Sequence, residues 1–168
     1  MDTPLLELDE IDFKVLHNLQ QDARLTNKEL ASRVSLSPPG LVKRMRRLER
    51  AGVLQQYTAL VDRQSVGLDL LCFVHVTLGH HEVEAVRRFR DAIVKIPEVL
   101  ECHHVTGEFD YLLKVLVRNH HTLELFLVDK LTPLPGVDRI RTNVVLREVK
   151  STTAVPIEDL RPSTSSGV

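Results

Sequence analysis

The spacing of apolar residues changes along this chain of 168 residues, and that change limits the folds open to it. As far as residue 52, apolar residues recur three or four positions apart, which is typical of helices. From residue 70 onward, alternating apolar runs are separated by two further helical stretches. The sequence therefore predicts two domains, the first helical and the second built on a sheet.

Three helices are predicted in the first domain. The first begins near Asp9, whose charge suits the positive end of a helix. A capping box from Thr26 to Glu29 starts a second, short helix, because the two side chains can bond each other's free amides. A third helix begins at Ser37 as its N-cap and ends before Gly52. The second and third helices are separated by only a short turn. Two helices joined in this way form a helix-turn-helix.

Positive charge gathers on one side of the third helix, opposite its apolar stripe. Its basic residues, spaced at i, i+3, i+4 and i+7, are Lys43, Arg46, Arg47 and Arg50. Four such cations repel one another unless a polyanion neutralises them, and DNA phosphates and guanine edges are suitable partners. The whole chain carries a net charge of −1, so the prediction rests on this local patch. The alternative is a solvated helix face that only aids solubility.

The candidate DNA contacts lie on the third helix and at the start of the helix before it. They are Asn27, Ser37, Pro39, Gly40, Lys43, Arg44, Arg46, Arg47 and Arg50. Among them, we expect Lys43, Arg46 and Arg47 to enter a groove of the duplex. Arg50 is expected to bind phosphate, and Pro39 or Gly40 to let the backbone approach. Strand-favouring residues over 53–61 predict a β wing beside this helix.

The second domain is predicted to have the order β-α-β-β-α-β. Its strands are expected over 70–78, 99–106, 111–117 and 137–149, and its helices over 82–96 and 121–131. This order is the ferredoxin-like split motif, in which a four-stranded sheet lies under two helices. The predicted fold class is therefore α+β, with a winged helix-turn-helix over 1–62 and a ferredoxin-like domain over 63–150. Residues 151–168 lose their periodicity and predict a flexible tail.

Several classes of protein are excluded by what the sequence lacks. It contains no nucleophile elbow, phosphate loop or zinc-protease motif, so no enzyme is predicted. The acidic start and the lack of an apolar run of ~20 residues predict a cytoplasmic chain without a membrane partner. Cys72 and Cys102 are expected to be buried free thiols.

Three pairs of adjacent histidines are the one unusual feature of the composition. They are His80–His81, His103–His104 and His120–His121. Adjacent residues on a strand point to opposite faces, whereas a metal site needs ligands that converge. We therefore expect solvated or hydrogen-bonded histidines, and neither a metal site nor a cofactor.

Nine stretches of the chain, in their order and spacing, resemble the Lrp/AsnC family of transcriptional regulators. The stretches are Leu8–Asp12, Asn27–Ala31, Val34–Ser37, Val42–Gly52, Glu101–His103, Val105–Gly107, Phe109–Lys114, Leu134–Val137 and Arg141–Thr142. The resemblance implies a regulator that binds double-stranded DNA at the nucleoid. It also implies a homodimer formed through the sheets, which assembles further to an octamer. The alternative is a stand-alone small-molecule-binding regulatory module of amino-acid metabolism.

The resemblance further implies that an amino acid or related metabolite binds between subunits, at a Gly-x-x-Asp-Tyr turn. The candidate effector residues are Val105, Thr106, Gly107, Glu108, Asp110 and Tyr111. A glycine lets the backbone come close to a ligand, and free amides in such a turn can bind a carboxylate. Asp110 can bind an ammonium group, and Tyr111 offers an apolar wall with a polar tip. Glu108 stands where close relatives often carry Asp, which predicts a reshaped pocket.

The alternative for this loop is a plain hairpin turn. In that case Asp110 would satisfy local amides of the backbone and would not meet a ligand.

Overall fold

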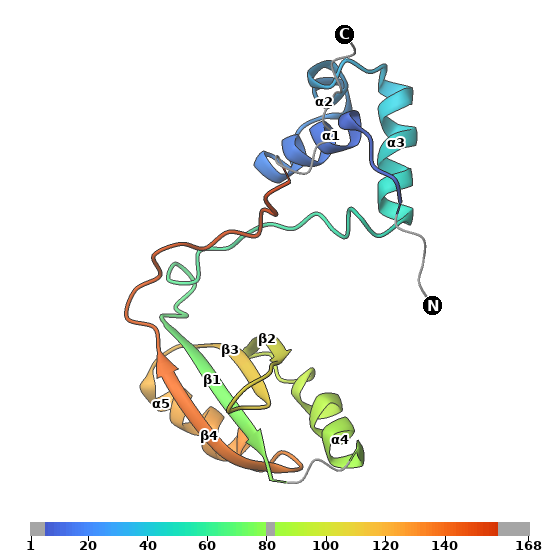
Figure 1. Cartoon of the computed structure of the whole chain (residues 1–168). Helices are drawn as coiled ribbons and strands as arrows, with labels where there is room; N and C mark the ends of the chain where they lie inside the picture. The colour runs from blue at the N-terminus through green and yellow to red at the C-terminus, as the bar shows by residue number, and fades with distance from the viewer. Residues whose placement is uncertain (1–5, 80–82, 158–168) are drawn as a thin grey trace. The chain divides into compact units, whose positions relative to one another are not determined.

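The computed structural model describes residues 6–79 and 83–157, and the chain divides into two compact units (Figure 1). The first unit comprises Met1–Leu60 with Ser151–Val168, and the second comprises Val61–Lys150. The boundaries at 60 and 150 lie within two residues of the predicted ones, but the segment after 150 groups with the first unit.

The first unit contains the three predicted helices, α1 (Glu10–Gln21), α2 (Asn27–Arg33) and α3 (Pro38–Arg50). The helices α2 and α3 begin at their predicted caps, Thr26 and Ser37, and α1 begins next to Asp9, near which it was predicted to start. All three residues accept a hydrogen bond from an amide of the first turn. The turn from α2 to α3 includes a residue with positive φ, Ser35 at 56°. The helix-turn-helix prediction is confirmed.

A small apolar core joins the three helices. Its buried members are Val15, Leu16, Leu19, Leu30, Ala31, Val34, Leu41 and Leu48. One carboxylate, that of Asp12, is buried beside them with no exposed surface. Such a carboxylate requires charged or hydrogen-bonding partners, because desolvating it alone is costly.

The segment after residue 150 has no helix or strand over its described part, yet some of it is held on the first unit. The side-chain amide of Gln20 donates to the carbonyl of Val155 at 3.1 Å, and the Val155 amide donates back at 2.6 Å. Ile157 packs against the core of the first unit. A flexible tail is therefore a poor description of residues 151–157, and residues 158–168 lie outside the described part of the chain.

The predicted β wing does not form. Residues 53–61 contain no strand, and Leu60 and Val61 are 75% and 69% exposed. Gly52 ends α3 with a φ of 70°, as predicted, and the amide of Val53 then bonds to the carbonyl of Leu48. A strand needs a partner for its backbone groups, and no described residue pairs with this segment.

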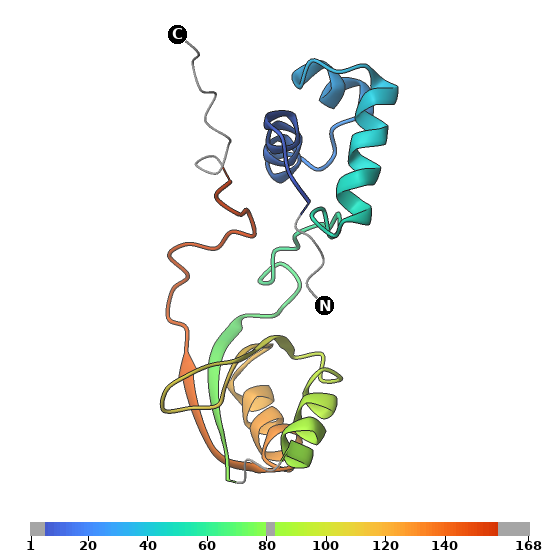
Figure 2. The same ribbon diagram turned by 45° about the vertical axis from the view of Figure 1, so that its right-hand side comes forward.

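The second unit confirms the ferredoxin-like order. Its elements are β1 (Leu70–Leu78), α4 (Val83–Ile93), β2 (Val99–His104), β3 (Tyr111–Val117), α5 (His120–Leu125), η1 (Phe126–Leu131) and β4 (Val137–Val144). The strands pair antiparallel in the order β2-β3-β1-β4. Helices α4 and α5 lie on one side of this sheet (Figure 2).

Several bounds in the second unit differ from their predictions. The helix predicted over 82–96 ends at Ile93. The helix predicted over 121–131 is a short α-helix that continues as the π-helix η1. Strand β2 ends at His104, and β4 ends at Val144, after which Leu146 and Val149 are almost fully exposed. Cys72 is buried as expected, but Cys102 is exposed, because it lies on the edge strand β2.

The core of the second unit lies between the sheet and its helices. Alternate residues of β1 and β3 face it, among them Val74, Val76 and Leu113, and Phe89 of α4 and Phe126 of η1 pack against them. The opposite set of alternate residues, on the face away from the helices, includes Phe73 and His75.

Candidate nucleic-acid interface and effector loop

A groove of about 670 Å³ runs along the outer side of α3 and the start of α2. Residues that line it include Asn27, Pro39, Val42, Lys43, Arg46 and Arg50. Among the described residues, Lys43 and Arg46 have no ion-pair partner. The groove therefore combines positive charge with an apolar floor, which suits phosphates and base edges.

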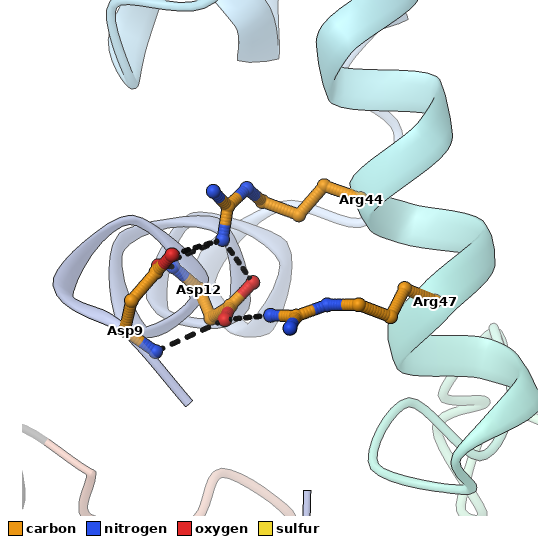
Figure 3. A network of polar contacts seen from close by, with 4 residues as sticks. All are labelled: Asp9, Asp12, Arg44 and Arg47. Carbon is orange, nitrogen blue, oxygen red and sulfur yellow. Dashed lines mark hydrogen bonds and ion pairs between the residues drawn. The ribbon is translucent and has the colours of Figure 1, made fainter. Parts of the chain in front are cut away.

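Two of the predicted DNA contacts point away from this groove, toward the start of α1 (Figure 3). The guanidinium of Arg44 lies 2.7 Å from the carboxylate of Asp9 and 2.6 Å from that of Asp12. Arg47 also pairs with Asp12. The side chains of Arg44 and Arg47 are only 20% and 40% exposed. Their charges are thus neutralised inside the unit, and the expectation that Arg47 lies in the groove does not fit this geometry.

The electrostatics of this cluster favour the charged forms of Asp9 and Arg44. Burial by itself would raise the pKa of Asp9. The hydrogen bond from Arg44, the backbone amides and the Arg44 charge outweigh it, so the pKa of Asp9 is lowered. For Arg44, burial would lower the pKa, but its bonds to Asp12 and Asp9 raise it overall. Asp9 and Arg44 therefore form an ion pair at neutral pH.

The remaining predicted contacts on α3 have varied roles. The hydroxyl of Ser37 accepts from the Gly40 amide at 3.3 Å, so it caps the helix. The groove is also lined by an acidic residue that was not among the predicted contacts. This residue, Glu49, accepts a hydrogen bond from the hydroxyl of Tyr57 at 3.1 Å. Burial, together with the bond to Glu49 and its charge, raises the pKa of Tyr57 to about 12. Sequence reasoning missed Val42 as a groove residue, although it precedes Lys43 on the same helix.

The Gly107 loop joins β2 to β3. Gly107 has a φ of 120°, a conformation that favours glycine. The loop is closed by a bond from the Val105 amide to the Asp110 carbonyl at 3.0 Å. The carboxylate of Asp110 accepts from the Leu78 amide at 2.7 Å, and its own amide donates to Val76. Asp110 thus ties the loop to the neighbouring strand β1, and the amide that its carboxylate accepts from belongs to that strand and not to the turn itself.

Tyr111 belongs to the core of the second unit. It is only 2% exposed, and its ring lies 4.7 Å from that of Phe89 and 5.0 Å from that of His104. Its hydroxyl accepts a hydrogen bond from Nε of Arg90 at 3.0 Å. Tyr111 therefore does not form an open wall in this subunit. Of the predicted effector residues, Thr106, Gly107 and Glu108 are exposed and Val105 is half-buried.

Three residues that were not among the predicted effector residues gather at this loop. The ring of Phe109 lies 4.5 Å from that of His75, and the Arg141 guanidinium lies 5.3 Å from the Phe109 ring centre. Arg141 is also 3.9 Å from the carboxylate of Glu108. The pairing of His75 with Arg141 across β1 and β4 brings them together, and only the strand register could have revealed it.

The adjacent histidines His103 and His104 have separate partners. His103 contacts Glu101 at 3.0 Å, whereas His104 stacks on Tyr111. His80 and His81 lie outside the described residues. Over 6–79 and 83–157, no three His, Cys, Asp or Glu side chains converge as a metal site would require. The helices in these same ranges are all too short or too polar to cross a bilayer.

Comparison with protein families matches both units. Residues 8–55 match a family described as winged helix-turn-helix DNA-binding, and residues 71–155 match the Lrp/AsnC ligand binding domain. The leucine-responsive regulatory protein of Escherichia coli K12 is 43% identical over 155 residues, which is 92% of this chain and 94% of that protein.

Solved structures are similar over nearly the same length. The crystal structure of a transcriptional regulator from Neisseria meningitidis in complex with L-methionine has a TM-score of 0.87 and 40% identity. The match covers 92% of this chain and 99% of that one. A feast or famine regulatory protein from M. tuberculosis, complexed with L-methionine, has a TM-score of 0.79 and 34% identity over 89% and 99% of the two chains.

Proposed function

Because the chain belongs to the Lrp/AsnC family of transcriptional regulators, we propose that its two units divide DNA binding and effector sensing between them. The chain is a ligand-sensing transcriptional regulator and not an enzyme. Our proposal concerns its residues. The outer groove of α3 would bind duplex DNA, and the Gly107 loop would bind an amino acid. A regulator of this kind acts on the chromosome, so we place it in the cytoplasm.

The observation that carries the DNA proposal is the division of the cations on α3. Lys43, Arg46 and Arg50 line the groove, while Arg44 and Arg47 are paired with α1. We therefore assign Lys43 and Arg46 to base edges or phosphate, and Arg50 to phosphate. Asn27 and Pro39 line the same groove, and Gly40 in the first turn of α3 adds no side chain that would block the approach.

To test this proposal, a duplex that the protein binds is first selected from a library of random DNA sequences. Fluorescence anisotropy would then give the affinity across a range of salt concentrations. We expect log K to fall linearly with log salt, because phosphate contacts release counterions. If the full chain binds no duplex even at low salt, the DNA proposal is wrong.

For the effector, we propose an α-amino acid with an apolar side chain. Two similar structures hold L-methionine, and a 43% identical relative is named for leucine. The exposed amides around Gly107 can receive a carboxylate, and Glu108 can receive an ammonium group. Val105 and Thr106 would line the site. Asp110 and Tyr111 would support the loop from beneath, without direct contact.

Calorimetry with L-methionine and L-leucine tests the effector site, with D-methionine as the ligand control. Gly107→Ala should weaken binding, because a φ of 120° is strained for alanine even though a Cβ would meet no atom within 4 Å. Gly67→Ala is a matched control, since Gly67 has a φ of 76° and equally open surroundings in the same unit. Equal loss in both variants would point to general strain and would remove the loop from the site.

We further propose that the chain forms a homodimer through the open face of its sheet and that dimers assemble to an octamer. An amino acid bound between subunits would then shift this assembly and the spacing of the DNA-binding units. Ligand and DNA affinities would be linked, so each must alter the other. Light scattering with and without L-methionine, alongside DNA titrations, tests this. If methionine binds but changes neither the assembly nor the DNA affinity, the linkage is absent.

A further inference from the structure

An ion-pair network of Asp9, Asp12, Arg44 and Arg47 joins the start of α1 to α3 (Figure 3). Other cations of the same helix line the outer groove, namely Lys43, Arg46 and Arg50. We propose that Asp9 and Asp12 are positioning residues for DNA recognition, which act through Arg44 and Arg47. The network sets the rotation of α3 about its own axis and thereby the direction of the groove-lining cations. This inference rests on the proposed contact between α3 and DNA.

The two carboxylates are themselves held in place by the cap of α1. The Asp12 amide donates to the Asp9 side chain at 2.8 Å, and the Asp9 amide donates to the Asp12 side chain at 3.0 Å. This reciprocal capping box fixes both side chains on the first turn of the helix. The acceptors for Arg44 and Arg47 are therefore arranged by local structure of α1.

Arg44 and Arg47 attach α3 to α1 at two points along the length of α3. They lie three residues apart, on one side of the helix, and both reach Asp12. Lys43 and Arg46 each precede one of them, so each lies about 100° further round the helix at 3.6 residues per turn. A rotation that broke the ion pairs would turn both cations away from the groove they line.

Apolar packing alone would define this rotation poorly. Leu41 and Leu48 bury α3 in the core, but aliphatic contacts tolerate small shifts. The Asp12 carboxylate has no exposed surface and receives Arg44, Arg47 and the Asp9 amide, so a shift would leave it unpaired. Breaking such a pair is costly, and a uniquely satisfied arrangement is favoured.

Two alternative roles for the network predict different results. If the carboxylates merely repelled DNA, their neutralisation would tighten binding. If Arg44 and Arg47 bound phosphate in the complex, freeing them would add contacts and steepen the salt dependence, by ~0.9 in slope per phosphate. Positioning instead predicts weaker binding with an unchanged slope. The sign of the change and the slope therefore separate the three roles.

The experiment uses the full chain and a duplex selected on the wild-type protein, with anisotropy titrations across salt. Asp9→Asn and Asp12→Asn should each weaken binding roughly tenfold, the size of one misplaced contact, with the salt slope unchanged. Glu10→Gln is the matched control: it removes the same charge from the same turn, but Glu10 pairs with Lys14 and lies outside the network. It should leave the affinity within about twofold.

A charge-conserving variant completes the test. Arg44→Lys keeps the cation but loses the forked geometry that reaches both carboxylates, so it should also weaken binding at constant slope. Helical content by circular dichroism identifies any variant that fails to fold. If Asp12→Asn fails, Asp9→Asn and Arg44→Lys decide the matter, since both sites are partly exposed.

Unchanged or tighter binding in Asp9→Asn and Arg44→Lys, with the fold retained, would overturn the inference. The DNA proposal itself is tested separately by Arg46→Ala. If Arg46→Ala loses affinity while Asp9→Asn does not, the groove assignment stands and the positioning role falls. If Arg46→Ala has no effect, the groove assignment fails whatever the network does.

Discussion

The two predicted sites differ in which residues stay available for a partner. On α3, the groove-lining cations remain at the surface, and the inward arginines find acids on another helix. In the Gly107 loop, the two most distinctive residues of the motif, Asp110 and Tyr111, are used by the fold itself. Residues of one sequence motif can therefore differ in role, some staying at the surface for a partner and others supporting the fold.

The two units are also stabilised in different ways. The first unit has a small core and contains Asp12, the one charged side chain that is buried among the described residues. The second has a larger, apolar core between its sheet and its helices. Substitutions in the second unit should therefore act through packing, and those in the first unit through charge.

The largest effect is expected for Tyr111→Ala, which tests whether this residue supports the loop or lines a site. Removing a buried aromatic ring should lower the free energy of unfolding by about 3–5 kcal/mol. Tyr111→Phe removes only the bond from Arg90 and should cost about 1 kcal/mol. Urea denaturation followed by circular dichroism measures both. If Tyr111→Ala retains its stability and loses only methionine binding, Tyr111 is a ligand contact after all.

A smaller effect on stability should distinguish Asp110 from Glu108, which lies in the same loop. Asp110→Ala leaves the Leu78 amide without its carboxylate acceptor, which should cost about 1–3 kcal/mol of stability. Glu108→Ala, at an exposed position, should change stability by less than about 0.5 kcal/mol and act on effector binding instead. Thermal unfolding and calorimetry on the same two variants test this division. Equal stability losses would contradict it.

In the first unit, Arg46→Ala should weaken DNA binding without destabilising the chain. The expected loss is about 1–3 kcal/mol of binding free energy, and the salt slope should fall by about one if Arg46 contacts phosphate. Arg24→Ala, an exposed arginine of the same unit outside the groove, is the control. Anisotropy titrations against salt give both quantities. Equal losses in the two variants would indicate that only overall charge matters.

The smallest effect is a pH dependence that belongs to the first unit. The pKa of Asp9 is lowered in the folded chain, so its contribution to stability is present above its ordinary pKa and is lost as pH falls below about 4. With solvent screening, the contribution should be at most about 1 kcal/mol. Thermal unfolding between pH 3 and about 6 should show a shallower acid slope in Asp9→Asn than in wild type. If stability fell equally steeply with pH in Asp9→Asn and in wild type, the ion pair of Asp9 with Arg44 would contribute nothing to stability.

In the second unit, Glu101 provides an internal comparison for this titration. Its pKa is also lowered, by hydrogen bonds from Lys114 and His103. The second unit should therefore keep its own acid dependence in Asp9→Asn, and a loss of that dependence as well would mean that the two units do not unfold independently.

The elements that could be predicted from the sequence are those that arise from interactions between residues close together in the chain. Capping residues started α1, α2 and α3 where they were predicted, because a cap bonds amides within its own turn. Alternation of apolar residues indicated the order of strands along the second unit, because it depends only on which residues can face a core. The positions of the basic helix and of the Gly107 turn followed in the same way.

The tertiary structure decided what depends on residues distant in the chain. Arg47 has helical spacing with Lys43 and Arg50, but the acid that binds it lies 35 residues earlier, and only the packing of α1 on α3 brings them together. Asp110 similarly bonds β1, and Gln20 holds Val155. The predicted wing failed for the converse reason, since strand-favouring residues without a partner strand cannot satisfy their backbone groups. Periodicity shows which face of an element is polar, but a charge is free for DNA only where no folded neighbour has already paired with it.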